Sequence, residues 1–149
     1  MTIKLCSACL LGIKCRYDGE CVSNEKVLSL AEKEVLIPIC PEQIGGLPTP
    51  RLNSEIQNGD GYAVLDHKAK VFESGGADVT NSFIAGAEEV LKIARLFNVS
   101  AVILKQRSPS CGSGQIYDGT FSGTIINGNG VTSALLKRNG IKVIAEDEL

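Results

Sequence analysis

Four short apolar segments alternate with helical patterns along this chain, and this alternation constrains the fold more than any other feature. The segments are rich in β-branched residues and lie at 2–6, 35–39, 101–105 and 142–145. Continuous apolar runs of this length are typical of parallel strands, because helices cover both faces of a parallel sheet. The pattern predicts an α/β, Rossmann-like fold: a mainly parallel sheet of about four strands, with helices on both faces.

The helical patterns lie at 24–33, 82–97 and 131–138. The first has an Asn or Ser available as its cap, and the last stops at Asn139-Gly140, a usual helix end. Segments 62–65 and 70–72, around Asp66-His67-Lys68, predict a small surface hairpin outside the main sheet. A length of 149 residues and the lack of a linker predict a single domain over 1–149.

Composition narrows the classes of partner. The net charge is −2, with 44% hydrophobic and 21% charged residues. The sequence has no block of Lys or Arg of the kind that binds nucleic acid or a membrane surface, so neither is expected as a partner. No apolar run approaches the ~18 residues of a membrane-spanning helix. We therefore expect a cytoplasmic protein that acts on a small molecule. No motif specifies an oligomeric state.

The six cysteines are the most informative residues, since cysteines in a reducing compartment indicate metal binding or catalysis more than disulfides. Cys9 follows the first predicted strand, Cys40 closes the second, and Cys111 lies in the loop after the third. Ligands bind at the carboxyl ends of strands in open α/β sheets, so these three thiols are expected to meet at one edge. Gly and Pro flank Cys40 and Cys111, which suits loops that hold a ligand closely.

The number of thiolates favours an iron–sulfur cluster over structural zinc. Zinc sites usually use paired Cys-x-x-Cys motifs, and only Cys6 and Cys9 have that spacing. Iron–sulfur clusters accept widely separated cysteines. Three protein ligands on a four-iron cluster leave one iron open, and an open position is typical of catalytic metals.

Plainer interpretations stand beside this one. Any one of these cysteines can simply pack in the core, which we predict for Cys6. Cys15 is an alternative first ligand to Cys9, and Cys21 has either a structural or a redox role.

Three motifs resemble the thiouracil desulfidase (TudS) family of YbbK-like bacterial proteins. They are CLLG at 9–12 with CRYDG at 15–19, CPE at 40–42 with GGLPTPR at 45–51, and LK at 104–105 with SPSCG at 108–112 and YDG at 117–119. The resemblance implies a [4Fe-4S] cluster held by Cys9, Cys40 and Cys111, with one iron not ligated by protein. It also implies removal of sulfur from a thiolated pyrimidine, either thiouracil or a 4-thiouridine nucleotide, to give the oxo base and hydrogen sulfide.

Neighbouring residues suit this hydrolytic, non-redox chemistry. Glu42 is the expected base for an attacking water, and Ser108 or Ser110 is expected to donate to the substrate ring or to the leaving charge. If the substrate is a nucleotide, the cations expected to hold its phosphate are Arg16, Arg51, Lys105 and Arg107. Otherwise Glu42 is a helix cap or a solvated acid, the serines are turn residues and the cations are surface charges.

The main competing function is a non-catalytic metal-binding or redox-sensing module that uses the same cysteines. A thiol enzyme with Cys111 as nucleophile is weaker, because the only histidine, His67, is far from Cys111 in sequence. The triplet Tyr-Asp-Gly occurs at 17–19 and 117–119, which is too short to indicate a repeat.

Overall fold

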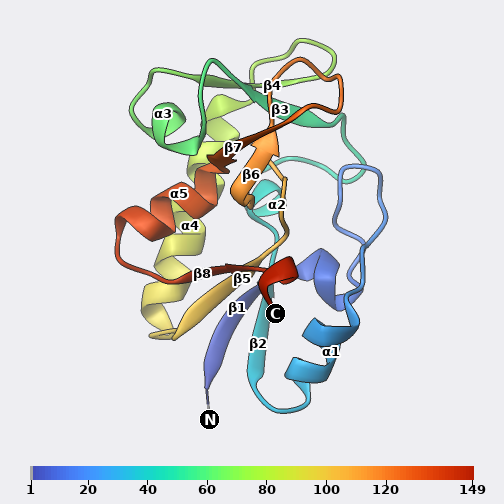
Figure 1. Cartoon of the computed structure of the whole chain (residues 1–149), viewed down its shortest axis with the longest axis vertical. Helices are drawn as coiled ribbons and strands as arrows, with labels where there is room; N and C mark the ends of the chain where they lie inside the picture. The colour runs from blue at the N-terminus through green and yellow to red at the C-terminus, as the bar shows by residue number, and fades with distance from the viewer. Residues whose placement is uncertain (1) are drawn as a thin grey trace.

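The computed structural model describes residues 2–149 and contains the predicted parallel sheet (Figure 1). Its strands are β1 (Ile3–Ser7), β2 (Val35–Ile39), β5 (Ala101–Leu104) and β8 (Val143–Ala145). They lie in the order β2-β1-β5-β8, and every neighbouring pair is parallel. From β1 the chain continues to β2 on one side, and it later returns to place β5 on the other side of β1. The loops after β1 and β5 therefore lead in opposite directions, which makes this a topological switch point.

Helices cover both faces of this sheet, as predicted. On one face α4 (Thr80–Leu96) and α5 (Val131–Arg138) bury Val90 and Leu136 against the strand residues Leu5 and Val102. On the other, α1 (Glu25–Ala31) buries Val27 in a cluster with strand residues of β1 and β5. The Asn24 side chain caps α1 by accepting hydrogen bonds from the first free backbone N–H groups.

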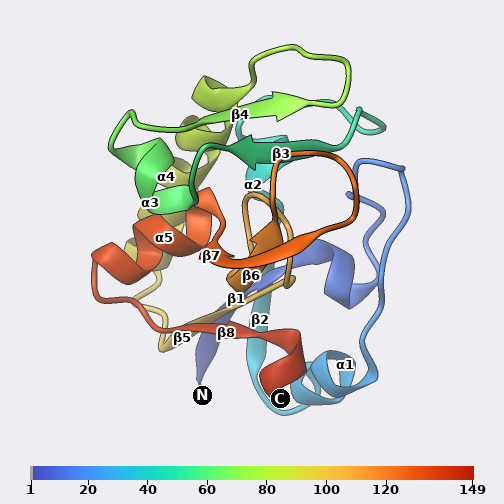
Figure 2. The ribbon, with the colours of Figure 1, turned by 45° about the horizontal axis from the view of Figure 1, so that its top comes forward.

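A second layer lies beyond the carboxyl ends of the parallel strands (Figures 1 and 2). It consists of the antiparallel pair β3 (Ser54–Gln57) and β4 (Lys70–Glu73), the antiparallel pair β6 (Ser113–Tyr117) and β7 (Ile125–Asn129), and α3 (Gly61–Leu65). Ile56, Val71 and Ile116 pack with Phe83 of α4 in a core of their own. This layer faces the switch point and closes a space above the sheet.

The predicted hairpin at 62–65 and 70–72 is wrong in its first half. Residues 61–65 form the short helix α3, and β4 pairs instead with β3, a strand that the sequence pattern did not reveal. Asp60 explains the helix, because its side chain accepts hydrogen bonds from the N–H groups of Tyr62 and Ala63. A four-residue apolar run fits a strand and a buried helix equally well, and this N-cap decides between them.

The short helix α2 (Pro41–Ile44) sits directly on α4. A Cβ atom at Gly86 would lie 2.0 Å from the carbonyl oxygen of Pro41, and one at Gly45 would lie 2.1 Å from that of Ser82. Glycine at both positions therefore lets the two backbones touch. This contact fixes the start of α2, where Cys40 and Glu42 lie. Two single 3₁₀ turns, η1 (Ala8–Leu11) and η2 (Glu146–Glu148), complete the fold.

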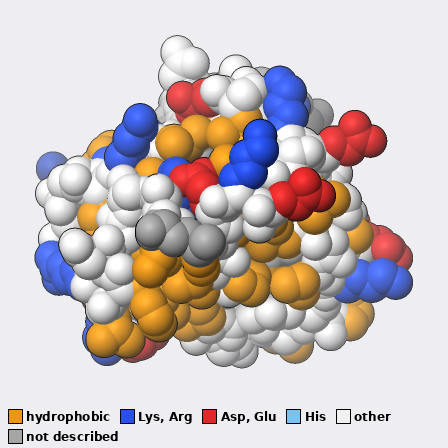
Figure 3. Space-filling view, turned by 90° about the horizontal axis from the view of Figure 1, so that it is seen from below, with side chains coloured by type: hydrophobic (Ala, Val, Ile, Leu, Met, Phe, Trp, Pro, Cys, Tyr) orange, Lys and Arg blue, Asp and Glu red, His pale blue; other side chains and the backbone are white. Residues whose placement is uncertain are grey.

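The face seen from below in Figure 3 carries hydrophobic side chains together with charged ones of both signs. This mixture agrees with the balanced composition. None of the helices in residues 2–149 is both long and apolar enough to cross a membrane.

Candidate active site

A cavity of about 370 Å³ lies between the sheet and the second layer, at the switch point. The sequence-predicted site residues all line it: Cys9, Arg16, Cys40, Glu42, Arg51, Lys105, Arg107, Ser108, Ser110 and Cys111. Cys15 lines it as well, whereas Cys6 is fully buried in the core, as predicted. The structure therefore brings together residues from three separate parts of the chain.

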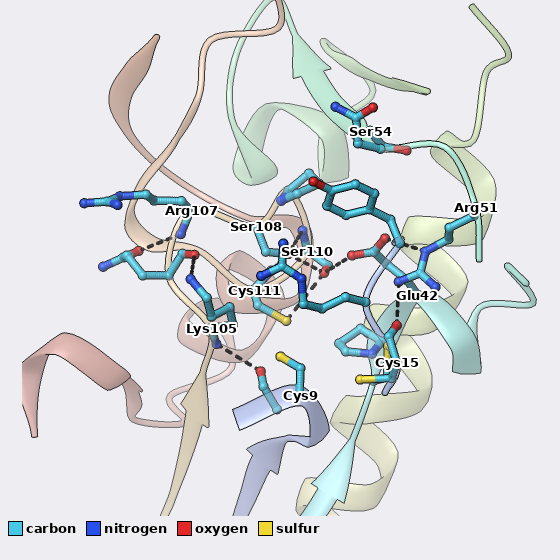
Figure 4. Close-up of a pocket in the computed structure, with 18 of the residues that line it drawn as sticks. Cys9, Cys15, Glu42, Arg51, Ser54, Lys105, Arg107, Ser108, Ser110 and Cys111 are labelled. Carbon is cyan, nitrogen blue, oxygen red and sulfur yellow. Dashed lines mark hydrogen bonds and ion pairs between the residues drawn. The ribbon is translucent and has the colours of Figure 1, made fainter. Parts of the chain in front are cut away.

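Cysteine side chains occupy one end of the cavity. In Figure 4, Cys9, Cys15 and Cys111 point toward the space beneath Glu42 and Ser110, and Ser54 lies at the opposite end. Cys9 belongs to η1, Cys40 directly follows β2, and Cys111 lies in the loop between β5 and β6. The Cys40 thiol donates to the Cys15 carbonyl oxygen at 3.7 Å, and the Cys15 thiol is hydrogen-bonded with the thiols of Cys40 and Cys9, so Cys15 belongs to the same group of sulfur atoms.

The surroundings raise the pKa of three of these thiols, those of Cys15, Cys40 and Cys111. Burial raises the pKa of the Cys111 thiol to about 12, although hydrogen bonds with Ser110 and Ser7 lower it. A hydrogen bond with Cys40 lowers the pKa of Cys15, but a bond with Cys9 and burial outweigh it and bring that pKa to about 11. The bond with Cys15 and burial raise the pKa of Cys40.

The candidate donors at this end of the cavity are thiols, the ligands that hold iron–sulfur clusters. Within residues 2–149, no three His, Cys, Asp or Glu side chains close around one metal ion. A four-iron, four-sulfur cluster is a larger body whose thiolates stand farther apart, and Cys9, Cys15, Cys40 and Cys111 surround a common space. Cysteines bind metals as thiolates, so iron would displace the proton of each thiol that it binds.

A row of hydrogen bonds runs along the cavity wall from Ser108 to Arg51 (Figure 4). Ser108 Oγ lies 2.9 Å from Ser110 Oγ, which lies 3.0 Å from Glu42 Oε2, and Arg51 Nε donates to Glu42 Oε1 at 3.1 Å. Ser108 Oγ already accepts from the N–H groups of Ser110 and Cys111, both at 3.2 Å. Its own hydrogen is therefore free for Ser110, whose single hydrogen has two acceptors within reach, Glu42 Oε2 at 3.0 Å and the Cys111 sulfur at 3.4 Å. When Ser110 donates to Glu42, the row runs toward the carboxylate.

The loop that carries Ser108, Ser110 and Cys111 is fixed to the start of α5. The N–H groups of Val131 and Thr132 donate to the carbonyl oxygens of Pro109 and Ser110, both at 2.8 Å. These bonds satisfy helix N–H groups that have no partner within the helix. Gly130 N–H donates to the Gly112 oxygen at 2.8 Å, and a Cβ at Gly130 would lie 2.5 Å from the Ser110 carbonyl carbon.

The Arg51 side chain links several loops through hydrogen bonds in addition to carrying a positive charge. Its guanidinium also donates to the carbonyl oxygens of Pro48 and Cys15, both at 3.0 Å, and to Thr49 Oγ1 at 2.9 Å. Only 5% of its side chain is exposed. One side chain therefore joins the cysteine-rich loop, the loop after α2 and Glu42.

The other three cationic side chains form fewer hydrogen bonds than Arg51 does. Lys105 Nζ lies 3.4 Å from Glu146 Oε2, Arg16 Nε lies 3.4 Å from Asp18 Oδ1, and Arg107 Nε donates to Gln115 at 3.3 Å. Figure 4 places Lys105 and Arg107 on the wall opposite Arg51. This arrangement leaves positive charge on the side of the cavity away from Glu42.

Several cavity residues were not singled out from the sequence. Tyr17 and Tyr117 both line the cavity, so each copy of the Tyr-Asp-Gly triplet contributes its tyrosine. Glu55 and Phe121 also line it. Phe121 has a φ of 57°, in the left-handed region that is rare for a bulky residue, and such backbone strain often marks functional sites. The repeated triplet was the one available signal.

Comparisons with known proteins agree with this site. The model of the 2-thiouracil desulfurase family matches residues 5–148. The chain belongs to the 2-thiouracil desulfurase family. It is 50% identical over 145 residues to YbbK of Bacillus subtilis (strain 168), which covers 97% of this chain and 96% of YbbK.

Among solved structures, the fold matches the [4Fe-4S]-dependent thiouracil desulfidase TudS with a TM-score of 0.87 and 40% identity. The match covers 100% of this chain and 93% of the TudS chain. The family resemblance and the α/β fold expected from the sequence are thereby confirmed.

Proposed function

We propose that this protein is a [4Fe-4S]-dependent desulfidase that hydrolyses a thiolated pyrimidine, such as thiouracil or 4-thio-UMP, to the oxo base and hydrogen sulfide. The observation that carries the proposal is the meeting of a buried cysteine group with the directed row from Ser108 to Glu42 in one cavity. The family and the TudS likeness support it.

Cys9, Cys40 and Cys111 are the proposed ligands, with one iron not ligated by protein. Each lies at the carboxyl end of a parallel strand or in the loop that follows one. When bound, the cluster supplies a Lewis-acidic iron that polarises the thiocarbonyl group. Cys15 lies beside this group and is the alternative to Cys9 as first ligand.

Glu42 acts as the base in this proposal. A proton from the attacking water passes to the Glu42 carboxylate through Ser110, whose oxygen keeps one acceptor site, while Ser108 holds Ser110 by donating to it. The water oxygen replaces sulfur on the ring carbon, and the protons leave with the sulfide. Atoms balance as thiocarbonyl plus water giving carbonyl plus hydrogen sulfide, with no net oxidation or reduction.

A nucleotide substrate would use the opposite wall. Lys105 and Arg107 on that wall, together with Arg16, are the proposed phosphate contacts, since each lines the cavity and has fewer hydrogen bonds than Arg51. Arg51 contributes mainly by holding Glu42 in place.

The test is anaerobic purification followed by incubation with thiouracil and with 4-thio-UMP. We expect a brown protein with broad visible charge-transfer absorption, loss of thiocarbonyl absorbance, and one sulfide released per base. Glu42→Gln is expected to retain the visible absorption and to lose about 10²- to 10⁴-fold in turnover. A colourless protein that holds one equivalent of zinc contradicts the proposal, and unchanged function in Glu42→Gln favours a non-catalytic module.

A further inference from the structure

Glu55 is a buried acid without a cation beside it. Its residue exposure is 5%, and it forms no ion pair with any residue in 2–149. Buried acidic side chains are rarely left without a compensating partner. Within residues 2–149, this carboxylate is compensated by two backbone N–H groups and by no cation.

The two oxygens of Glu55 have different surroundings. Oε1 accepts hydrogen bonds from the N–H groups of Gly119 at 2.9 Å and Phe121 at 3.2 Å. Oε2 receives no donor from the part of the chain that the structure describes, and Glu55 lines the cavity. One oxygen thus holds the loop between β6 and β7, and the other is left for a ligand that donates hydrogen bonds.

The position of Glu55 indicates which part of the ligand it meets. It follows Ser54, which Figure 4 places at the end of the cavity away from Cys9, Cys15 and Cys111. A thiocarbonyl group that reaches the cysteine end leaves the remainder of the substrate to extend toward Glu55. Phe121, held by the same carboxylate, adds an aromatic wall to this end.

We propose that Glu55 is a specificity-determining residue that accepts a hydrogen bond from the ribose 2′-hydroxyl of a nucleotide substrate. This inference rests on the proposed desulfidase function and adds the sugar to it. A carboxylate oxygen is acceptor-only, and ribose presents neighbouring hydroxyl donors, which is how acidic side chains recognise ribose in dinucleotide-binding proteins. The site then prefers ribonucleotides to deoxyribonucleotides and to the free base.

Binding of the oxo product tests this without requiring turnover. Isothermal titration of the anaerobically purified protein with UMP and with dUMP isolates the 2′-hydroxyl, since the two ligands differ only there. We expect UMP to bind about 10- to 100-fold more tightly, as a hydrogen bond to a charged group allows. Glu55→Ala is expected to bring the ratio close to one. Glu55→Gln, whose amide oxygen can still hold the loop, is expected to lower the ratio as well, because an NH₂ donor then replaces the acceptor Oε2.

Gln57→Ala is the matched control, because Gln57 Nε2 holds the same loop through the Gly119 oxygen at 3.2 Å and does not line the cavity. It is expected to preserve the UMP to dUMP ratio. Equal affinities in the unaltered protein overturn the inference, as does an unchanged ratio in Glu55→Ala. Ribose-dependent binding without sulfide release contradicts the desulfidase function alone. Turnover of 4-thio-UMP without ribose preference contradicts only the role of Glu55.

Discussion

Replacing Arg51 by Lys tests whether this residue is mainly a structural tie. The substituted side chain would keep the charge next to Glu42, but a single ammonium cannot reach the three further acceptors: the oxygens of Pro48 and Cys15 and the hydroxyl of Thr49. Each lost hydrogen bond costs about 1 kcal/mol, so Arg51→Lys should lower the free energy of unfolding by about 2–4 kcal/mol. The 5% exposure of the Arg51 side chain leaves little room for water to replace these bonds.

Urea unfolding of the reduced protein, monitored by circular dichroism, measures this loss as a shift of the midpoint at constant m-value. Arg107→Lys is the matched control, since its side chain makes one long hydrogen bond to Gln115. It should change stability by less than about 0.5 kcal/mol. If Arg51→Lys costs no more than the control and instead raises KM for the nucleotide alone, Arg51 binds phosphate and the structural argument is refuted.

Three further outcomes are expected. Ser110→Ala should lower turnover by about 10²- to 10⁴-fold while the visible absorption persists, because it removes the 3.0 Å hydrogen bond from Ser110 Oγ to Glu42 Oε2. Turnover equal to that of the wild type would exclude proton transfer through Ser110. Gly86→Ala should lower the free energy of unfolding in urea by about 1–3 kcal/mol, because the added Cβ would lie 2.0 Å from the Pro41 carbonyl oxygen. Glu88→Ala, at an exposed position of the same helix, should leave this free energy nearly unchanged. Equal effects of the two substitutions would argue against close packing of α2 on α4. The Tm of the metal-free protein should fall as the pH rises above 9.0. Thiols of the unfolded chain lose their protons there, whereas burial raises the pKa of Cys111 to about 12, so the folded state binds more protons. A Tm that does not change with pH, or an equal fall in Cys111→Ala, would contradict this expectation.

The parallel sheet was predictable because each of its strands is a local signal. Every predicted strand of the parallel sheet lies within one residue of its observed bounds, and the 131–138 helix matches α5. The convergence of Cys9, Cys40 and Cys111 followed from topology alone, since carboxyl ends of parallel strands share one edge. Local pattern and general chain geometry were enough for the cysteine end of the site.

The far end of the cavity was not predictable in this way. Strand β3 contains a buried glutamate, and β7 contains Gly128 and two asparagines, so neither resembles a strand when considered alone. The strand β3 is fixed by its pairing with β4 and by the packing of Ile56 with Phe83 of α4, and β7 by its pairing with β6, which a local pattern does not report. Glu55 and Phe121 therefore became visible as site residues only in three dimensions.

The hydrogen bond from the Gly130 N–H group to the Gly112 carbonyl oxygen bears on how related sequences can differ. It closes the β6–β7 excursion at its base, so the ends of this hairpin stay together whatever its tip contains. Tyr117 and Phe121, which line the outer cavity, belong to the excursion, whereas Cys111 lies just before it. Substitutions or insertions in the hairpin can thus reshape the outer cavity without displacing Cys111, so the proposed substrate contacts can change while the proposed cluster ligand stays in place.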